Sequence, residues 1–360
     1  MKVVNILLNY KKSTHNNQVL GVERCFLDYS KNLILKGVEV VSVMKSKIFL
    51  VEEAKKTNSK VYELPAFNQG DIYSIIKLAW LFFSFSPNLV ICHSGRALLF
   101  SRIARILVFK KIPIVVVDHG INPLKFINAD YVMTVNSHFS KELVKAGKPL
   151  DRALVIPNMI EIPENFQPLI KENFPKKIRL GSLGRLSFEK NFDKVIRAMA
   201  ILKSQNIDCE YVIGGVGIEK DNLEKLAVDL KLENNFKILG WVENKREFFS
   251  NIDIFILPSL CETFGIVLLE AMLYSTPIIS ANSWGPDEII TDRFNGLKIN
   301  KDDLQFVNLI AQAIIELRDD QDLARTIANN AYRDLLQKYT SQVVSKKLYE
   351  ICQQISKKNI

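Results

Sequence analysis

Residues 254–280, IFILPSLCETFGIVLLEAMLYSTPIIS, hold a strand, a turn and a helix within one short stretch. The apolar run Ile254–Leu257 predicts a buried strand, which Pro258 ends. Phe264–Leu273 has the apolar spacing of a helix, and Pro277–Ser280 predicts the following strand. Strands that alternate with helices in this way are typical of a parallel sheet with helices on its faces.

Two carboxylates frame the turn in this stretch. Glu262 precedes the predicted helix, and Glu270 lies on it about two helical turns further on. A helix that begins beyond the carboxyl end of a strand points unpaired N–H groups at the space above the sheet, where they favour an anionic ligand. Gly265 allows a ligand to approach the backbone closely. The alternative is a solvated Glu262 and a Glu270 that merely favours helix formation.

The rest of the chain repeats this alternation over a length that suits two domains. The chain has 360 residues, 48% of them hydrophobic, so each domain can bury its own core. We predict an α/β protein with two doubly wound Rossmann-like domains facing a central cleft. The expected strands of the first domain are Val3–Leu8, Val38–Val43, Leu89–Cys92, Ile114–Val117, Val132–Val135 and Leu154–Ile156, and those of the second before residue 254 are Ile178–Leu183, Cys209–Ile213 and Phe236–Leu239.

A proline-rich segment of mixed charge, Glu161–Lys177, is the best candidate for the linker between the domains. The predicted domains are therefore 1–165 and 166–340. A C-terminal helix over 341–360 is expected to pack back on the N-terminal domain. The main helices expected are Val22–Lys36 in the first domain and Asn191–Lys203, Asp221–Leu230 and Lys245–Ser250 in the second.

Composition excludes several classes of protein. The longest nearly apolar run, Ile72–Phe85, contains Lys77 and is too short to span a bilayer, and the amino terminus predicts a first strand instead of a signal peptide. The five cysteines and four histidines are too dispersed to predict a disulfide framework or a metal site. We therefore expect a reduced, cytoplasmic protein without a metal.

The net charge is concentrated in the first half of the chain. Residues 1–165 contain 22 Lys and Arg against 13 Asp and Glu, whereas residues 166–360 contain 26 of each. A basic half favours an anionic partner, and no nucleic-acid motif is visible, so a membrane surface or an anionic acceptor ranks first. The basic segment 96–111 also fits an anionic membrane, although a crossover helix with a basic outer face is the commoner explanation.

Four further positions after predicted strands are candidates for a site. Arg185 and Lys190 follow Leu183 and suit phosphate oxygens, although a solvated basic pair beside Glu189 explains them as well. His119 follows the strand that ends at Val117, where a structural histidine is the alternative. Gly21 opens a predicted helix and allows a phosphate or an acceptor to approach, although an ordinary turn would also place a glycine there.

Together these residues resemble the retaining GT-B glycosyltransferases of family four, the glycosyl transferases group 1. The resemblance rests on their order and spacing over essentially the whole chain, and the N-terminal half matches more loosely, through 21–24 and His119-Gly120. The matching segments are Gly184-Arg185-Leu186, Glu189-Lys190-Asn191, Pro258-Ser259, Glu262-Thr263-Phe264-Gly265, Leu269-Glu270-Ala271-Met272, Pro277-Ile278-Ile279 and Glu288-Ile289-Ile290.

The resemblance implies the GT-B fold and a nucleotide-diphosphate sugar as donor substrate, with UDP-sugars favoured. It implies that the C-terminal domain binds this donor and the N-terminal domain the acceptor. Arg185 and Lys190 would neutralise the diphosphate, Glu270 would bind ribose hydroxyls, and Glu262 would bind hydroxyls of the transferred sugar. Backbone N–H groups near Phe264, Gly265 and Ile266 would meet the sugar and phosphate, and His119 would lie near the sugar and acceptor. The catalytic set is then Glu262, His119, Arg185 and Lys190, with no metal and no cofactor.

Some positions depart from the family pattern. Gly215-Val216-Gly217-Ile218 stands where a G-D-G-P-like turn is usual, and Trp284-Gly285-Pro286-Asp287 replaces a double glycine. We expect transfer of a hexose or N-acetylhexosamine to a lipid-linked or lipopolysaccharide-type glycan at the cytoplasmic membrane face. The alternatives are a GT-B-like sugar-nucleotide epimerase, a phosphorylase, or a non-catalytic nucleotide-sugar-binding subunit.

Overall fold

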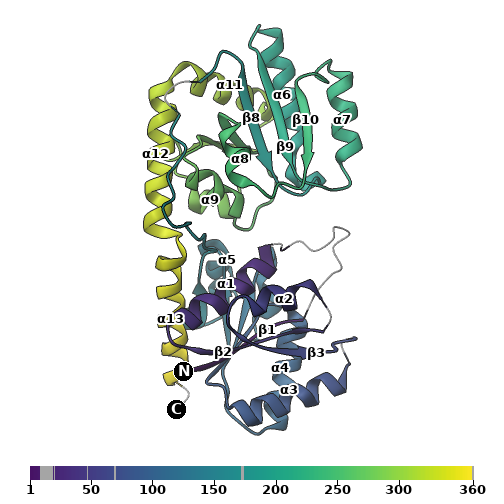
Figure 1. Cartoon of the computed structure of the whole chain (residues 1–360), viewed down its shortest axis with the longest axis vertical. Coiled ribbons are helices and arrows are strands. Elements are labelled where there is room, and N and C mark those ends of the chain that lie inside the picture. Colours follow the sequence, from purple (N-terminus) through teal and green to yellow (C-terminus); the bar gives the residue numbers. More distant parts are fainter. Residues whose placement is uncertain (9–18, 20, 47, 69, 172–173, 359–360) are drawn as a thin grey trace. The chain divides into compact units, whose positions relative to one another are not determined.

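The computed structural model describes residues 1–8, 19, 21–46, 48–68, 70–171 and 174–358, and it divides the chain into two compact units (Figure 1). Unit 1 comprises Met1–Met159 and Ser341–Ile360, and unit 2 comprises Ile160–Thr340. The division falls a few residues before the predicted boundary at 165. The C-terminal helix α13 (Ser341–Lys358) lies in unit 1, where it packs against α1 (Gly21–Leu35).

Unit 1 is built on a parallel sheet of seven strands in the order β3-β2-β1-β4-β5-β6-β7. The strands are β1 (Lys2–Leu7), β2 (Glu39–Lys45), β3 (Lys60–Leu64), β4 (Leu89–Cys92), β5 (Ile114–Asp118), β6 (Tyr131–Thr134) and β7 (Ala153–Val155). The sequence did not predict β3. This strand lies at the edge of the sheet and its residues are mostly half-buried, so it lacks the continuous apolar run of a strand covered on both faces.

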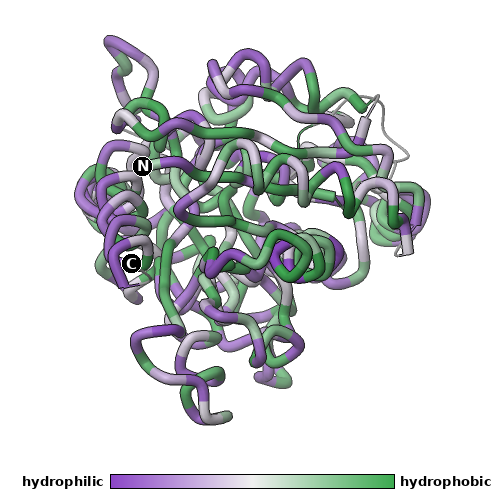
Figure 2. Tube along the Cα trace, turned by 90° about the horizontal axis from the view of Figure 1, so that it is seen from below, coloured by the Kyte–Doolittle hydropathy of each residue, from purple (hydrophilic) through white to green (hydrophobic). Residues whose placement is uncertain are grey.

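Helices cover both faces of this sheet. One face is covered by α3 (Ile72–Phe85), α4 (Gly95–Leu107) and α5 (Ser137–Lys145), and the other by α1 and α13. A further helix, α2 (Phe49–Lys55), packs against α1 and β3. In Figure 2 the helical coils carry both hydrophobic and hydrophilic residues, which is the amphipathic pattern of helices that cover a sheet.

Unit 2 contains a parallel sheet of six strands in the order β10-β9-β8-β11-β12-β13. The strands are β8 (Ile178–Leu183), β9 (Cys209–Gly214), β10 (Phe236–Gly240), β11 (Ile254–Leu257), β12 (Ile278–Ala281) and β13 (Leu297–Ile299). The helices are α6 (Phe192–Ser204), α7 (Lys220–Asp229), α8 (Lys245–Ser250), α9 (Ile266–Leu273), α10 (Trp284–Ile289), α11 (Phe306–Asp319) and α12 (Gln321–Lys338). The prediction of two Rossmann-like parallel-sheet domains is confirmed.

Each sheet has a point at which the order of the strands reverses. In unit 1 this point lies between β1 and β4, and in unit 2 it lies between β8 and β11. Loops that leave the carboxyl ends of two such strands turn to opposite faces of the sheet and leave a crevice, where ligands bind in open α/β sheets. The candidate residues follow β8 and β11 in unit 2 and cluster near the ends of β1, β4 and β5 in unit 1.

Two further observations bear on the sequence predictions. Within the described residues, no helix is both long enough and apolar enough to cross a bilayer. All five cysteines are free, and four of them are buried.

Candidate functional site

The loops that follow β8 and β11 are joined by hydrogen bonds at the switch point of unit 2. The Leu260 amide donates to the Glu189 carbonyl oxygen at 2.9 Å, and the Asn191 side-chain amide donates to the Pro258 carbonyl oxygen at 3.2 Å. The two strands pair directly, with Ile254 opposite Leu180. Residues that are far apart in the sequence are therefore held at one edge of the sheet.

Lys190 and Glu262 form an ion pair between these two loops. Only 16% of the lysine side chain and 15% of the glutamate side chain are exposed. The Glu262 backbone is also fixed, because its amide donates to Ser283 Oγ at 2.8 Å and its carbonyl oxygen accepts from the Gly285 amide at 3.0 Å. The structure thus places a cation and a carboxylate together at the position where the sequence predicted a ligand.

The helix α9 follows Glu262, as predicted, but it begins at Ile266 instead of Phe264. Gly265 precedes it with φ of 90°, a backbone conformation that favours glycine. This left-handed residue turns the chain between the buried Phe264 and the first helical turn. The free N–H groups of that turn lie at the carboxyl end of β11, beside Glu262.

Gly285, at the start of α10, is required by a close backbone contact. A Cβ atom at this position would lie 2.3 Å from Phe264 Cα and 2.4 Å from the Phe264 carbonyl oxygen. The Trp284-Gly285-Pro286 segment therefore packs directly on the turn that carries Glu262. This segment differs from the double glycine of the family pattern, but it retains Gly285, the glycine that makes this contact.

Glu270 lies on α9 and has a partner that the sequence did not predict. Lys245 Nζ, from α8, is 3.2 Å from Glu270 Oε2. Within the described part of the chain this buried oxygen accepts no hydrogen bond. Glu270 thus offers an acceptor for a donor such as a hydroxyl group. No sequence signal identified Lys245, because the contact depends on how α8 and α9 face each other.

Arg185 and Lys190 have different surroundings, although both follow β8. Arg185 Nη2 is 2.7 Å from Glu189 Oε1, and 72% of the arginine side chain is exposed. The solvated pair beside Glu189, which the sequence left open, describes Arg185, whereas Lys190 is paired with Glu262. Arg185 can turn toward a ligand at little cost, because exposed ion pairs contribute little stability.

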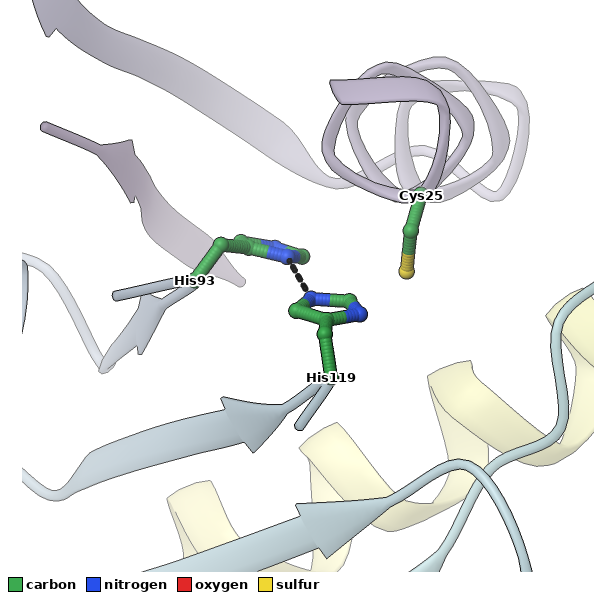
Figure 3. A group of neighbouring side chains, drawn as sticks. All are labelled: Cys25, His93 and His119. Atoms are coloured by element: carbon green, nitrogen blue, oxygen red, sulfur yellow. Dashed lines mark hydrogen bonds between the residues drawn. The ribbon is translucent and has the colours of Figure 1, made fainter. Parts of the chain in front are cut away.

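A cluster of polar side chains lies at the switch point of unit 1, where His119 was a candidate (Figure 3). His119 follows β5, His93 follows β4 and Cys25 lies on α1. Their Nδ1 or Nε2 and Sγ atoms all lie within 4.8 Å of one another. Histidines that are dispersed in the sequence are therefore neighbours in space. Because β4 and β5 are adjacent parallel strands, the shared position of both histidines after a strand was a signal that the sequence offered.

Hydrogen bonds assign the protons in this cluster. The Asn5 amide group donates to the Phe26 carbonyl oxygen and to Ser30 Oγ, both at 2.9 Å. Asn5 Oδ1 therefore accepts from His93 Nε2, also at 2.9 Å. His93 Nδ1 then carries a lone pair and accepts from His119 Nε2 at 3.1 Å (Figure 3).

Within the described residues, this chain of hydrogen bonds leaves His119 Nδ1 without a donor, as an acceptor on a neutral ring. Burial, and then the charge of Lys125, lower the pKa of His119 to about 4. Burial, and then His119, hold the pKa of His93 well below its usual range. Burial raises the pKa of the Cys25 thiol well above its usual range, and Asp28 adds to this shift. The cluster offers the ligand types of a zinc site, but one nitrogen of each ring is already engaged in the hydrogen bond between the rings.

The acidic neighbour of His119 is also buried. Asp118, the last residue of β5, accepts a hydrogen bond from the Gly120 amide at 3.2 Å, and Lys125 Nζ lies 3.3 Å from it. Burial raises the pKa of Asp118, and Lys125 opposes that rise. Gly21 is the first residue of α1 and is exposed, while most of the loop before it lies outside the described residues. His119 and Gly21 belong to unit 1, and the other candidate residues belong to unit 2.

Comparison with known proteins agrees with this division. Residues 164–334 match the family model of the glycosyl transferases group 1, and residues 19–163 match that of glycosyltransferase family 4. The chain belongs to the GT-B glycosyltransferases. The two matches meet at residue 163, close to the division between the two units.

Several individual proteins resemble this glycosyltransferase. An uncharacterized glycosyltransferase of Methanocaldococcus jannaschii is 30% identical over 250 residues, which are 65% of this chain and 62% of that protein. The lipopolysaccharide core biosynthesis glycosyltransferase LpsE of Rhizobium meliloti is 30% identical over 164 residues, 46% of each chain. The crystal structure of HepE of Anabaena in complex with UDP and glucose superposes with a TM-score of 0.78 at 21% identity, covering 98% of this chain and 100% of that chain.

The extent of these matches differs between sequence and structure. The chain spans about half to three-fifths of the length of these two curated relatives. The likeness to HepE covers both units but, at 21% identity, shows the fold alone.

Proposed function

We propose that this protein transfers a hexose or N-acetylhexosamine from a nucleotide-diphosphate sugar to a lipid-linked or lipopolysaccharide-type glycan at the cytoplasmic face of a membrane, with retention of the anomeric configuration. A UDP-sugar is the favoured donor. The single observation that carries the proposal is the Lys190–Glu262 ion pair at the N-terminus of α9, with Glu270 on the same helix.

Each of these groups suits a different part of the donor. Lys190, joined by the exposed side chain of Arg185, suits the diphosphate, which carries negative charge. Glu262 suits hydroxyl groups of the sugar, and Glu270 suits the two hydroxyl groups of the ribose. Because Glu270 lies about two turns along α9 from Glu262, the two carboxylates bind opposite ends of one extended ligand.

Donor binding requires the Lys190–Glu262 pair to exchange partners. In the free protein the two charges satisfy each other in a mostly buried position. In the complex the lysine pairs with a phosphate oxygen and the carboxylate accepts from a sugar hydroxyl. The pair thus keeps both groups ordered before the donor arrives, which lowers the entropy cost of binding.

The proposed chemistry is a substitution at the anomeric carbon. The acceptor hydroxyl oxygen forms a bond to this carbon on the face from which the diphosphate leaves, and the bond between the carbon and the phosphate oxygen breaks. The hydroxyl proton passes to an oxygen of the departing diphosphate. Lys190, Arg185 and the N-terminus of α9 stabilise the negative charge that develops there. This scheme uses no metal and no cofactor, because the protein's own cations lie at the leaving group.

His119 is proposed to act in the same reaction from unit 1. Its free Nδ1 accepts a hydrogen bond from a hydroxyl group of the sugar or of the acceptor. The neutral state of the ring suits this role, because a protonated imidazole has no acceptor. Asn5 and His93 then act as positioning residues that keep the acceptor nitrogen of His119 free.

The relatives support the substrate classes without defining them. LpsE is named for lipopolysaccharide core biosynthesis, and HepE was crystallised with UDP and glucose. The excess of basic residues in 1–165 supports an acceptor held at an anionic membrane surface.

A thermal-shift screen against UDP-, GDP- and ADP-sugars tests the donor. A ligand at 100 times its dissociation constant stabilises a protein by roughly 2.7 kcal/mol, so we expect the UDP-sugars to raise the melting temperature most. Incubation of the best donor without an acceptor then separates the alternatives. An epimerase would change the sugar unaided, whereas a transferase leaves it intact apart from slow hydrolysis. Stabilisation by none of the nucleotide sugars would contradict the proposal.

A further inference from the structure

An apolar helix of unit 1 exposes large side chains to solvent. Of the residues of α3, Ile72, Tyr73, Ile76, Trp80 and Phe83 are each more than half exposed. Positions 72, 76, 80 and 83 recur at the spacing of one helix face, while the opposite face, with Leu78 and Phe82, is buried against the sheet. A helix face that is apolar normally lies against a partner, and within the described residues this outer face of α3 is exposed.

The end of α4 adds to this surface. Ile106 and Leu107 are more than half exposed in its last turn, and Phe109, two residues beyond the helix, is 95% exposed. The buried residues of α4, such as Phe100 and Ala104, face the sheet. The sequence left two explanations for segment 96–111, and the structure shows the crossover helix, with an outer surface at its end that is apolar as well as basic.

One lysine joins the two groups of apolar side chains. Lys110, which follows α4, donates to the Phe83 carbonyl oxygen at 3.2 Å and to Ser86 Oγ at 2.7 Å, and its Nζ lies 5.3 Å from the centre of the Phe83 ring. The helices α3 and α4 also pack against each other. We call this surface the α3–α4 face; it consists of Ile72, Tyr73, Ile76, Trp80, Phe83, Ile106, Leu107 and Phe109.

The segment that forms this face carries charges of one sign only. Between Ile72 and Val117 the sequence contains six basic residues and no Asp or Glu. The three arginines are used within unit 1: Arg96 and Arg102 donate to carbonyl oxygens, and Arg105 pairs with Asp130. Two of the lysines also donate to carbonyl oxygens, Lys77 to that of Glu63 at 3.3 Å and Lys110 to that of Phe83, while Lys111 is exposed.

These lysines have the arrangement of residues at a membrane interface. Lys77 Nζ lies 5.8 Å from the centre of the Tyr73 ring, Lys110 lies over Phe83, and Lys111 is exposed beside Phe109 in the sequence. Long cationic side chains that lie along apolar groups can keep their charge at lipid headgroups while the apolar groups enter the bilayer boundary.

We propose that the α3–α4 face docks on an anionic lipid bilayer, with Trp80, Phe83 and Phe109 inserted at the headgroup level and with Lys77, Lys110 and Lys111 on lipid phosphates. This inference rests on the proposed transfer to a membrane-bound acceptor, for which it names the surface. A second copy of this chain fits less well, because two such faces in contact would oppose lysines without any carboxylate between them.

Vesicle sedimentation tests the proposal with the full-length chain. We expect binding to phosphatidylcholine vesicles that contain phosphatidylglycerol, weaker binding at high salt because the lysine contacts are screened, and little binding to phosphatidylcholine alone. Trp80→Ser with Phe109→Ser should weaken binding by about tenfold or more, because two large apolar side chains are lost. Lys110→Glu with Lys111→Glu should weaken it by at least about fivefold for each lysine.

A matched control uses exposed apolar residues of unit 2. Ile218 is 87% exposed and Leu304 is fully exposed, so Ile218→Ser with Leu304→Ser removes apolar surface without touching the α3–α4 face and should leave vesicle binding unchanged. The emission of Trp80 supplies a second measurement. It should shift to shorter wavelength with anionic vesicles and be quenched by brominated lipid, and Trp80→Phe should remove both signals.

Several results would overturn the proposal. These are absence of binding to anionic vesicles, equal losses in the control variant, or a dimer in solution that Trp80→Ser dissociates, which would assign the face to a second copy. The thermal shift with UDP-sugars, measured on the same variants, should be unchanged. A wild-type protein that binds vesicles but no nucleotide sugar would refute the proposed transfer alone, and one that binds UDP-sugars but no vesicles would refute the docking surface alone.

Discussion

Lys190 and Glu262 are paired across 72 residues of sequence, on loops that follow two adjacent parallel strands. Neither side chain is more than about one-sixth exposed, so each depends on the other for its charge to be satisfied. Breaking such a pair by removing one partner is costlier than removing both, because the remaining charge is left without a counter-ion. Because each charge depends on its partner, we expect a substitution of either residue to affect ligand binding strongly.

We expect Lys190→Ala to lower kcat/KM for sugar transfer on the order of 100-fold or more, because it removes a cation from the leaving diphosphate. Initial rates of nucleotide release measure this effect. Lys194→Ala is the matched control, since Lys194 lies on α6 and pairs with the neighbouring Asp193 at the surface. The control should retain wild-type rates. Unchanged transfer by a Lys190→Ala and Glu262→Ala double variant would show that the pair has no part in catalysis.

Substitution of Glu270 should weaken binding of the nucleotide part of the donor and leave the contribution of the sugar unchanged. Loss of a hydrogen bond to a charged group costs about 1.5–3 kcal/mol, so Glu270→Ala should weaken binding of UDP and of the UDP-sugar by the same factor. Glu262→Ala should weaken binding of the UDP-sugar much more than that of UDP. Titration calorimetry with both ligands separates these effects, and Glu247→Ala, an exposed position on α8, is the control. If Glu262→Ala and Glu270→Ala weakened UDP binding equally, the assignment of Glu270 to the ribose and Glu262 to the sugar would be contradicted.

Gly285→Ala tests the contact between α10 and the turn of Glu262. The added Cβ would lie 2.3 Å from Phe264 Cα, and because the obstacle is backbone, the loop must move. We expect a loss of stability of roughly 3 kcal/mol or more, in the range of severe overpacking, measured by denaturant unfolding. Gly95→Ala is the control. Its Cβ would meet only the Phe126 ring at 3.8 Å, at the first residue of α4, so the variant should stay within about 1 kcal/mol of wild type.

The elements that the sequence predicted best are those covered on both sides. β4, β8 and β11 have the predicted bounds, because their short apolar runs are bounded by prolines, glycines or polar residues. The edge strands β3 and β13 were missed, since KVYEL and LKI lack a continuous apolar run. α9 was predicted to begin two residues too early. The apolar Phe264 fits the helical pattern, but Gly265 has a left-handed backbone conformation, so the helix begins only after it.

The candidate site could be predicted where its residues follow strand ends. Lys190 and Glu262 were each predicted as site residues because they follow β8 and β11, and the resemblance assigned both to one donor, but their direct ion pair was not predicted. Contacts between helices could not be predicted from strand ends. The Lys245–Glu270 pair depends on which sides of α8 and α9 face each other. His93 also follows a predicted strand, as His119 does, but no motif identified it as a candidate.

The tautomer of His119 is the fourth prediction. The chain from Asn5 through His93 places the proton of His119 on Nε2. Nitrogen-15 NMR should therefore show a protonated Nε2 and a bare Nδ1 on both rings at neutral pH. His93→Phe should keep an aromatic ring in the core but release His119, giving a mixture of tautomers and a lower kcat. A His119 that carries its proton on Nδ1 in the wild type would contradict the assignment.

The two buried histidines also make stability depend on pH. The pKa of His119 is lowered to about 4 in the folded protein by burial and then by Lys125, and that of His93 is also far below its usual range, whereas an unfolded histidine titrates near about 6.5. Between these values the unfolded chain binds more protons, so stability falls as pH falls from about 6.5 toward 4, by at most about 1.4 kcal/mol per pH unit for each histidine. Asp118 opposes this slope, because its raised pKa lets the folded form take up a proton first.

Denaturant unfolding at a series of pH values measures this slope. His93→Gln should flatten the curve between pH 6.5 and 4, because the variant no longer has to bury a neutral imidazole. His138→Gln, at an exposed position on α5, should leave the curve as in the wild type. Parallel curves for His93→Gln and the wild type would mean that His93 is not held neutral by burial, and the neutral His119 acceptor proposed for transfer would lose its support.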